Sequence, residues 1–265
     1  MRVLNVCNLK GGVGKTITAI NKACILAEIH KKKVLVVGND KQGNTSKFFG
    51  VHGYDHPSIA DLMTGARTAK EVIRHTAYER IDIIPANMSL LAANKAVLLD
   101  TMKPQQTRIK NALAEVEALY DIAIIDNAPD ENMSVINALT AGDDVIIPVK
   151  VDKFTMDGVD EMLQCIRQVK ENFNPKLIFR GCVITNFRKN EVNSQGAAYL
   201  ASQPKYRLMS THIHWSMKVD ESTFTSLPIV KHSPRSWAAR DYKRLVAEYL
   251  ALVGGMSDSD TEGSA

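Results

Sequence analysis

The sequence has few of the residues and patterns that set a chain apart from ordinary globular proteins. Of its 265 residues only four are cysteines and two are tryptophans, and aromatic residues make up 6%. The cysteines stand far apart and match no zinc, haem or thioredoxin spacing, so we expect buried thiols in a reducing compartment; they are Cys7, Cys24, Cys165 and Cys182. No run of about 18 apolar residues occurs, which excludes an ordinary membrane-spanning helix, and the first residues predict no secretory leader.

The charge balance is mildly positive, with 33 basic against 29 acidic residues, 45% hydrophobic residues and 23% charged ones. This composition excludes collagen-like, disulfide-scaffold and wholly disordered chains, but a surplus of four does not by itself indicate a nucleic-acid partner. Three of the acids fall in the small, polar segment 254–265, which has no lysine or arginine, and we expect a disordered acidic tail there. Residues 1–253 then hold 33 basic and 26 acidic residues, a surplus of seven.

Short apolar runs alternate with helical patterns along residues 1–253, which is typical of α/β proteins. Several runs are continuous instead of alternating, such as Ile122–Ile125, and this indicates strands buried on both faces, as in a parallel sheet. Because no linker divides the chain, we predict one doubly wound α/β domain with a mostly parallel central sheet flanked by helices. The expected strands are Val3–Asn8, Lys33–Gly38, Ile81–Pro85, Asp121–Asp126, Val145–Val149 and Ile178–Thr185. The expected helices are Thr16–His30, Gln105–Tyr120, Met133–Ala141, Met156–Phe173 and Ser236–Val253.

A glycine-rich loop follows the first expected strand and opens the first expected helix; it reads Lys10-Gly11-Gly12-Val13-Gly14-Lys15-Thr16. This is the context of a phosphate-binding loop, in which glycines let backbone N–H groups turn toward phosphates and the helix adds its positive end. In such a loop Lys15 would reach the β- and γ-phosphates, and the Thr16 hydroxyl would bind Mg²⁺. The general pattern has glycine at the position of Leu9, whereas this chain has a second lysine, Lys10, before paired glycines.

The variant loop resembles the deviant Walker A motif of the ParA/MinD family of P-loop NTPases, and most of the chain resembles the small ParA-type partition ATPases. The resemblance implies that two subunits enclose ATP in a sandwich dimer, and that Lys10 reaches across the interface to the partner's nucleotide. It also implies a nucleotide-binding set in which Ile17 contributes its backbone N–H; the set is Lys10, Gly11, Gly12, Val13, Gly14, Lys15, Thr16 and Ile17. Within this set, Lys10 and Lys15 would also act in catalysis.

Two strand-end carboxylates extend the resemblance. Asp40 lies in the segment Val34–Asn44, which looks like the family's Asp-x-Asp-Pro-Gln-Gly-Asn sequence, and the resemblance assigns to Asp40 the positioning of the attacking water. A second interpretation stays open for Asp40, that of a turn-forming residue before Gly43. Asp126 follows four apolar strand residues as a Walker B carboxylate does, and it would hold Mg²⁺ together with Thr16.

Two departures from the family's pattern concern hydrolysis. Gly38 stands where the first aspartate of the pair is usual, and Lys41 replaces the usual proline. Loss of a carboxylate near the metal weakens the ordering of the metal's water shell. We therefore hypothesise that the chain binds ATP but hydrolyses it slowly; the alternative is a hydrolysis-impaired, ATP-gated DNA-binding or positioning scaffold of the same family.

Two later segments concern the nucleotide base and DNA. The segment Thr185-Asn186-Phe187 ends a late strand where the family packs adenine, which implies that role for Asn186. The segment His232–Tyr242 resembles the one that opens the last helix of partition ATPases, which use basic residues near this end to hold DNA non-specifically. The candidates on one side of that helix are Arg240, Lys243 and Arg244, with Lys218 and Arg235 as weaker ones. A plain solvated face is the alternative interpretation of the same residues.

The resemblance implies a cytoplasmic, nucleoid-associated ATPase that segregates a plasmid or similar element. A centromere-binding, ParB-like partner would stimulate hydrolysis and so release the dimer from DNA. A nitrogenase-type electron carrier would need closely placed cysteines, which this chain does not offer. A MinD-type ATPase recruited to membranes would end in a basic amphipathic helix, whereas segment 254–265 is acidic, so we expect no membrane partner.

Overall fold

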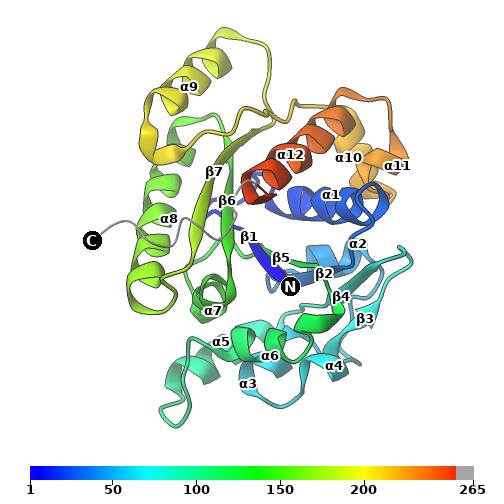
Figure 1. The fold of residues 1–265 in the computed structure, drawn as a ribbon, viewed down its shortest axis with the longest axis vertical. Coiled ribbons are helices and arrows are strands. Elements are labelled where there is room, and N and C mark those ends of the chain that lie inside the picture. Colours follow the sequence, from blue (N-terminus) through cyan, green and yellow to red (C-terminus); the bar gives the residue numbers. More distant parts are fainter. Residues whose placement is uncertain (255–265) are drawn as a thin grey trace.

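A seven-stranded sheet forms the centre of the molecule in a computed structural model (Figure 1), which describes residues 1–254 apart from the side chains of 153–157. The strand order is β3-β4-β2-β5-β1-β6-β7, and all neighbours pair in parallel except β3 and β4. The strands are β1 Arg2–Val6, β2 Val34–Asn39, β3 Arg74–His75, β4 Ile81–Ile84, β5 Ile122–Asn127, β6 Asp144–Lys150 and β7 Ile178–Thr185.

Helices cover both faces of the sheet, because successive side chains of a strand point to opposite sides. Val34 and Val36 of β2 pack on the side of α1 and α12, whereas Leu35 and Val37 pack on the side of α3, α5 and α6. The first group of helices comprises α1 Lys15–Glu28, α2 Asn44–Phe48, α10 Met217–Phe224, α11 Ile229–His232 and α12 Trp237–Gly254. The others are α3 Ile59–Thr64, α4 Ala69–Val72, α5 Ser89–Leu99, α6 Arg108–Ala114, α7 Met133–Ala141, α8 Lys153–Asn172 and α9 Glu191–Ser202, with short 3₁₀ turns at Glu117–Leu119 and Pro204–Tyr206.

The predicted doubly wound, mostly parallel architecture is confirmed, and all six expected strands are present. Two expectations need correction. The helix expected over Gln105–Tyr120 is divided into α6 and a 3₁₀ turn, and the antiparallel strand β3 was not expected. The tail predicted at 254–265 lies, after Gly254, outside the described residues.

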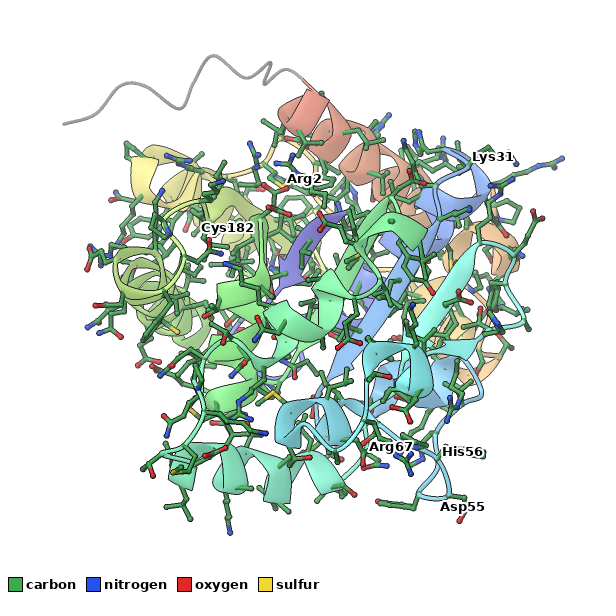
Figure 2. All side chains as sticks on the ribbon, turned by 60° about the horizontal axis from the view of Figure 1, so that its bottom comes forward. Arg2, Lys31, Asp55, His56, Arg67 and Cys182 are labelled. Carbon is green, nitrogen blue, oxygen red and sulfur yellow. The ribbon has the colours of Figure 1, made fainter. Side chains whose placement is uncertain are left out.

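The cysteines are buried and free, as expected from their apolar neighbours; Cys182, for example, lies on β7 inside the fold (Figure 2). Among residues 1–254, no helix has both the length and the hydrophobicity that crossing a membrane requires. The carboxyl ends of the parallel strands all meet at one edge of the sheet, and this edge carries most of the residues singled out in the sequence.

Candidate nucleotide-binding site

The loop between β1 and α1 has the backbone of an anion cradle. Gly12 and Gly14 adopt left-handed conformations with φ of 72° and 82°, which a residue with a Cβ rarely adopts. A Cβ added at Gly11 or Gly12 would meet nothing within 4 Å, so the face of the loop above these glycines is open. The following helix begins without a side-chain cap, and its first N–H groups are therefore available to an anionic ligand.

Lys15 points into this cradle. Its Nζ donates a hydrogen bond to the Lys10 carbonyl at 2.8 Å, and its side chain is buried. Burial lowers the pKa of the Lys15 ammonium, and the nearby carboxylates of Asp126 and Asp40 partly oppose that shift. The sheet edge thus places one cation and two carboxylates close together around the loop.

Lys10 is held from two sides. Its backbone N–H donates to Asn8 Oδ1 at 2.9 Å, and the Asn8 amide donates in turn to the Pro148 carbonyl at 2.8 Å. On the other side, the Lys10 side chain lies against Gly158 of α8, where an added Cβ would be 2.8 Å from Lys10 Cγ. Only a residue without a Cβ lets α8 approach the lysine this closely.

Asp126 ends β5 as a buried carboxylate with one oxygen left over. Its Oδ2 accepts a hydrogen bond from the Thr45 hydroxyl, whereas Oδ1 is buried without a hydrogen-bond partner in the described part of the chain. Burial raises the pKa of Asp126 to about 6, although hydrogen bonds from Thr45 and Thr16 and the charge of Lys15 act in the opposite direction. A buried, unpartnered carboxylate oxygen beside the Thr16 hydroxyl fits a Mg²⁺ ligand set that is completed by phosphate oxygens and water.

Asp40 forms a turn and lies close to the glycine loop. Its Oδ1 accepts the Gln42 N–H at 2.9 Å and its carbonyl accepts the Gly43 N–H at 2.9 Å, so the residue does form the turn after β2. At the same time its charge acts on both Lys15 and Asp126, which places it beside the loop.

Gly38 lies in a tightly packed part of β2. It pairs in register with Asp126, and an added Cβ would lie 3.3 Å from Ala86 Cβ and 3.4 Å from Ser46 Oγ. The same Ser46 hydroxyl accepts the Ala86 N–H at 2.8 Å. A side chain at position 38 would therefore require these neighbours to move by a few tenths of an ångström.

Several residues of this edge were not singled out in the sequence. Asn39 donates to Asn127 Oδ1 at 2.8 Å and Asn127 donates to Asn5 Oδ1 at 3.0 Å, which ties together β2, β5 and β1. Thr45 holds Asp126, although it follows directly after the segment that contains Asp40. Thr185, at the end of β7, donates to the Val13 carbonyl at 2.8 Å. Each of these contacts joins segments far apart in the chain.

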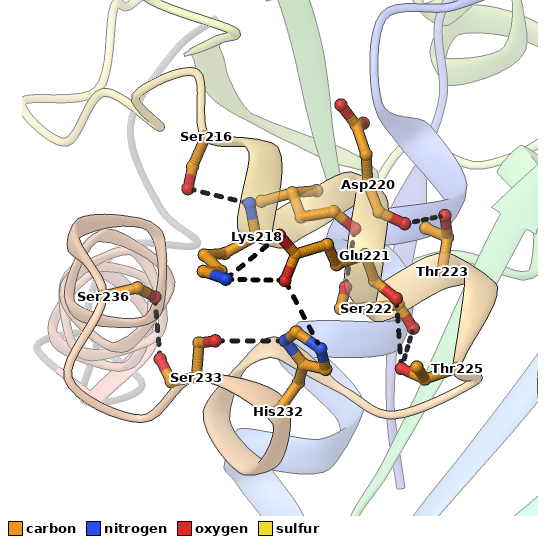
Figure 3. Close-up of polar contacts among 11 residues, drawn as sticks. Ser216, Lys218, Asp220, Glu221, Ser222, Thr223, Thr225, His232, Ser233 and Ser236 are labelled. Atoms are coloured by element: carbon orange, nitrogen blue, oxygen red, sulfur yellow. Dashed lines mark hydrogen bonds and ion pairs between the residues drawn. The ribbon is translucent and has the colours of Figure 1, made fainter.

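The base-binding candidate follows a residue that contacts the loop, and the basic candidates lie mostly on exposed positions. Asn186 is exposed and has a left-handed backbone, with φ of 53°, immediately after the residue that contacts Val13. Lys243 is half-buried, and the other basic candidates are exposed; they are Lys218, Arg235, Arg240 and Arg244. Lys218 is not a free cation, because its Nζ pairs with Glu221 at 2.8 Å, and Glu221 also faces His232 (Figure 3).

Comparison with known proteins agrees with this geometry. Residues 1–179 match the AAA domain family. The sporulation initiation inhibitor protein Soj of Bacillus subtilis is 32% identical over 254 residues, which cover 94% of this chain and 98% of Soj. Cobyrinic acid a,c-diamide synthase from Mycobacterium smegmatis, solved with an ATP analogue and magnesium, matches with a TM-score of 0.83 at 26% identity over 97% of both chains.

A plasmid partition protein of Borrelia burgdorferi bound to AMPPNP has the same fold, with a TM-score of 0.81 at 20% identity over 95% of this chain and 98% of that one. The fold and the loop therefore define a P-loop ATPase with a deviant Walker A motif. The chain belongs to the ParA/MinD family, as its motifs predicted.

Proposed function

We propose that the chain is a Mg²⁺-dependent partition ATPase whose ATP-bound dimer holds DNA non-specifically. The buried, unpartnered oxygen of Asp126 beside Lys15 and the open glycine loop is the observation that carries the nucleotide part of this proposal. Its relatives include proteins named for chromosome partitioning, from Treponema pallidum and Caulobacter vibrioides, and these support the partition part.

Each residue of the site has a place in phosphoryl transfer. Lys15 and the backbone N–H groups from Gly11 to Ile17 neutralise phosphate charge, and Thr16 and Asp126 hold Mg²⁺. Bound ATP and Mg²⁺ supply the transferable phosphoryl group and the charge that stabilises its transfer. Asp40 orients the attacking water from the turn after β2. Asn186 contacts the adenine base in this proposal.

The sandwich dimer depends on Lys10, which contacts the partner's nucleotide. Light scattering should show a dimer with ATP but a monomer with ADP or without nucleotide, and Lys10→Ala should remain a monomer throughout. DNA should be retained with ATP and not with ADP. A protein with the same mass in all these conditions would contradict the proposal.

Gly158→Ala is expected to weaken ATP-dependent dimerisation by about tenfold or more, a free-energy loss near 1.4 kcal/mol. The added methyl group would lie 2.8 Å from Lys10 Cγ and displace the lysine, while the glycine loop that binds ATP is untouched. Sedimentation with ATP measures dimerisation, and a fluorescent ATP analogue checks that nucleotide affinity is retained. Gly53→Ala is the matched control, because a Cβ there meets nothing within 4 Å. Equal dimerisation of the two variants would show that Gly158 does not position Lys10.

Gly38→Asp tests the hypothesis of slow hydrolysis. An aspartate at position 38 is expected to raise DNA-stimulated phosphate release by about fivefold. Loss of a residue that orients a metal's ligands typically changes activity by roughly 10- to 100-fold, and we expect a smaller gain here because position 38 is crowded. Gly38→Ala introduces the same crowding near Ala86 without the charge, and should not gain activity. Equal rates for wild type and Gly38→Asp would remove Gly38 as the cause of slow turnover. Intact dimerisation without any phosphate release by the wild type would favour the scaffold alternative.

The arrangement of α12 supports a DNA-binding face. The Asp241 carboxylate accepts hydrogen bonds from the backbone N–H and from the ring Nδ1 of His214. The Glu248 carboxylate accepts hydrogen bonds from the backbone N–H groups of Ser210 and Thr211. The acids of this helix are thus engaged by the segment that precedes α10, and its arginines remain exposed. An outer face of this kind attracts DNA phosphates independently of sequence. A centromere-binding, ParB-like partner then stimulates hydrolysis, and this takes place in the cytoplasm at the nucleoid. Residues 1–253 form the ATPase domain.

A further inference from the structure

Two buried hydroxyl side chains attach the short helix α2 to the strand ends around the nucleotide loop. The Thr45 hydroxyl donates a hydrogen bond to Asp126 Oδ2 on β5. The Ser46 hydroxyl accepts the N–H of Ala86, just beyond β4, at 2.8 Å. Neither side chain is exposed to solvent by more than 1%. Because β4 and β5 are the two neighbours of β2 in the sheet, α2 is fixed on both sides of the strand that precedes it.

The same helix continues directly from the turn that carries Asp40. The Gly43 N–H donates to the Asp40 carbonyl at 2.9 Å, and the Lys47 N–H donates to the Gly43 carbonyl at 2.9 Å, so the turn and α2 share Gly43. This glycine has φ of 62°, and an added Cβ would lie 2.6 Å from the Ala86 carbonyl oxygen and 2.6 Å from His52 Cδ2. The turn is therefore tightly packed, and the position of Asp40 depends on where α2 is held.

The contact from Thr45 also decides which oxygen of Asp126 is left for a metal. A carboxylate group can rotate about its last bond, but the hydrogen bond from Thr45 occupies Oδ2, and Oδ1 remains buried and unpartnered in the described part of the chain. Gly38, which pairs in register with Asp126, has no side chain that could hold the carboxylate instead. The Thr16 hydroxyl also hydrogen-bonds Asp126, but it is itself a proposed metal ligand. Thr45 thus supports the carboxylate from outside the metal's own ligand set.

We propose that Thr45 is a positioning residue that holds both carboxylates of the site with one hydroxyl group, Asp126 directly and Asp40 through α2. The inference rests on the proposed function, in which Asp126 holds Mg²⁺ and Asp40 orients the attacking water. It adds a dependence between the two roles, because release of α2 would disturb both carboxylates together. The phosphate contacts are independent of it, since Lys15 is held by the Lys10 carbonyl within the glycine loop.

Thr45→Val tests the proposal, because valine has nearly the shape of threonine without the hydroxyl group. With a fluorescent ATP analogue, the half-saturating Mg²⁺ concentration should rise by about tenfold or more, and phosphate release at saturating Mg²⁺ should fall by about tenfold or more. Binding of the analogue in EDTA should equal that of wild type. Thr45→Ser keeps the hydroxyl and should stay within about threefold of wild type in every assay. Thr140→Val is the matched control, since Thr140 is also buried but donates to the Ile136 carbonyl within α7 at 2.8 Å.

Amide hydrogen exchange of the nucleotide-free protein provides a readout without ATP or metal. Thr45→Val should exchange faster than wild type at residues 40–48 and equally in α1. Wild-type Mg²⁺ dependence together with wild-type exchange at 40–48 would overturn the positioning role and leave the proposed function intact. Weaker Mg²⁺ binding with unchanged exchange would overturn the link from Thr45 to Asp40. Equal losses in Thr45→Val and Thr45→Ser would show that the hydroxyl group is not the cause. A wild type that binds the analogue and releases phosphate without regard to Mg²⁺ would overturn both the inference and the proposed function.

Discussion

Asp126→Asn is expected to lower ATP hydrolysis by about a hundredfold or more while making the nucleotide-free protein more stable. The hydrolysis effect follows because an amide is a poorer Mg²⁺ ligand than a carboxylate, and transfer of a phosphoryl group depends on the metal's charge. The stability effect follows because burial raises the pKa of Asp126 to about 6, so the ionised side chain destabilises the folded protein at any higher pH.

The pH dependence of the stability checks the sign of this second effect. In metal-free buffer at pH 8 the variant should gain about 2 kcal/mol in the free energy of unfolding, and the gain should vanish below about pH 4, where Asp126 is protonated in both states. Urea denaturation measures the stability, and phosphate release measures the hydrolysis. Asp55→Asn provides the control, since Asp55 projects from the surface (Figure 2) and should change neither. An Asp126→Asn protein with wild-type turnover would remove Asp126 from the metal site.

Lys22→Met is expected to stabilise the protein by several kilocalories per mole near neutral pH. Lys22 is fully buried on α1, and its Nζ has no hydrogen-bond partner among the described residues, only the ring of Tyr249 with its centre 4.2 Å away. Burial lowers the pKa of Lys22 to about 7, although Asp144 and Glu248 act in the opposite direction. A methionine side chain has about the length of the lysine side chain, carries no charge and can still make a favourable contact with the ring of Tyr249.

The expected pH dependence is distinctive. The unfolded chain keeps the Lys22 proton up to about pH 10, whereas the folded chain releases it near pH 7, so the destabilisation is complete below pH 7. We expect Lys22→Met to gain on the order of 4 kcal/mol at pH 6 and progressively less as the pH rises toward 10. Lys32→Met removes an exposed charge and should change the stability by less than about 0.5 kcal/mol. A gain that does not decrease between pH 7 and pH 10 would show that the buried charge is not its source.

The sheet could be predicted because its strands carry their signal locally. Strands such as β2 and β5 are buried on both faces and read as unbroken apolar runs. By contrast, β3 is a pair of residues, Arg74 and His75, held only by its neighbour β4, and no periodicity exists over such a length.

The helices that were not expected lack a one-sided apolar pattern. α5 buries Leu90 but exposes Leu91 and Leu98, so it is apolar around its circumference. α9 has one buried residue, Leu200, and hence no apolar stripe at all. For α3 a signal was present, because Ser58 and Asp61 form a capping box at its start.

The glycine loop could be predicted in detail because its glycines and lysines lie close together in the sequence, and the backbone conformation of the loop depends on these residues alone. The asparagine network and the contact from Thr45 to Asp126 could not be predicted. The first depends on the register between strands and the second on where α2 packs against β5, and the residues that meet are about 80 or more positions apart. The same holds for Gly158, whose role against Lys10 depends on where α8 packs.

The hydrogen bond from Thr185 to the Val13 carbonyl joins the nucleotide loop to the end of β7. Arg188 lies only three residues further along the same backbone, and Phe187 between them is hydrogen-bonded to the segment that carries Trp215. A displacement of the loop at Val13 that keeps this bond would also displace the end of β7, from which the chain continues to Arg188. One hydroxyl group and a few residues of chain thus connect the nucleotide loop to the exposed residues after β7.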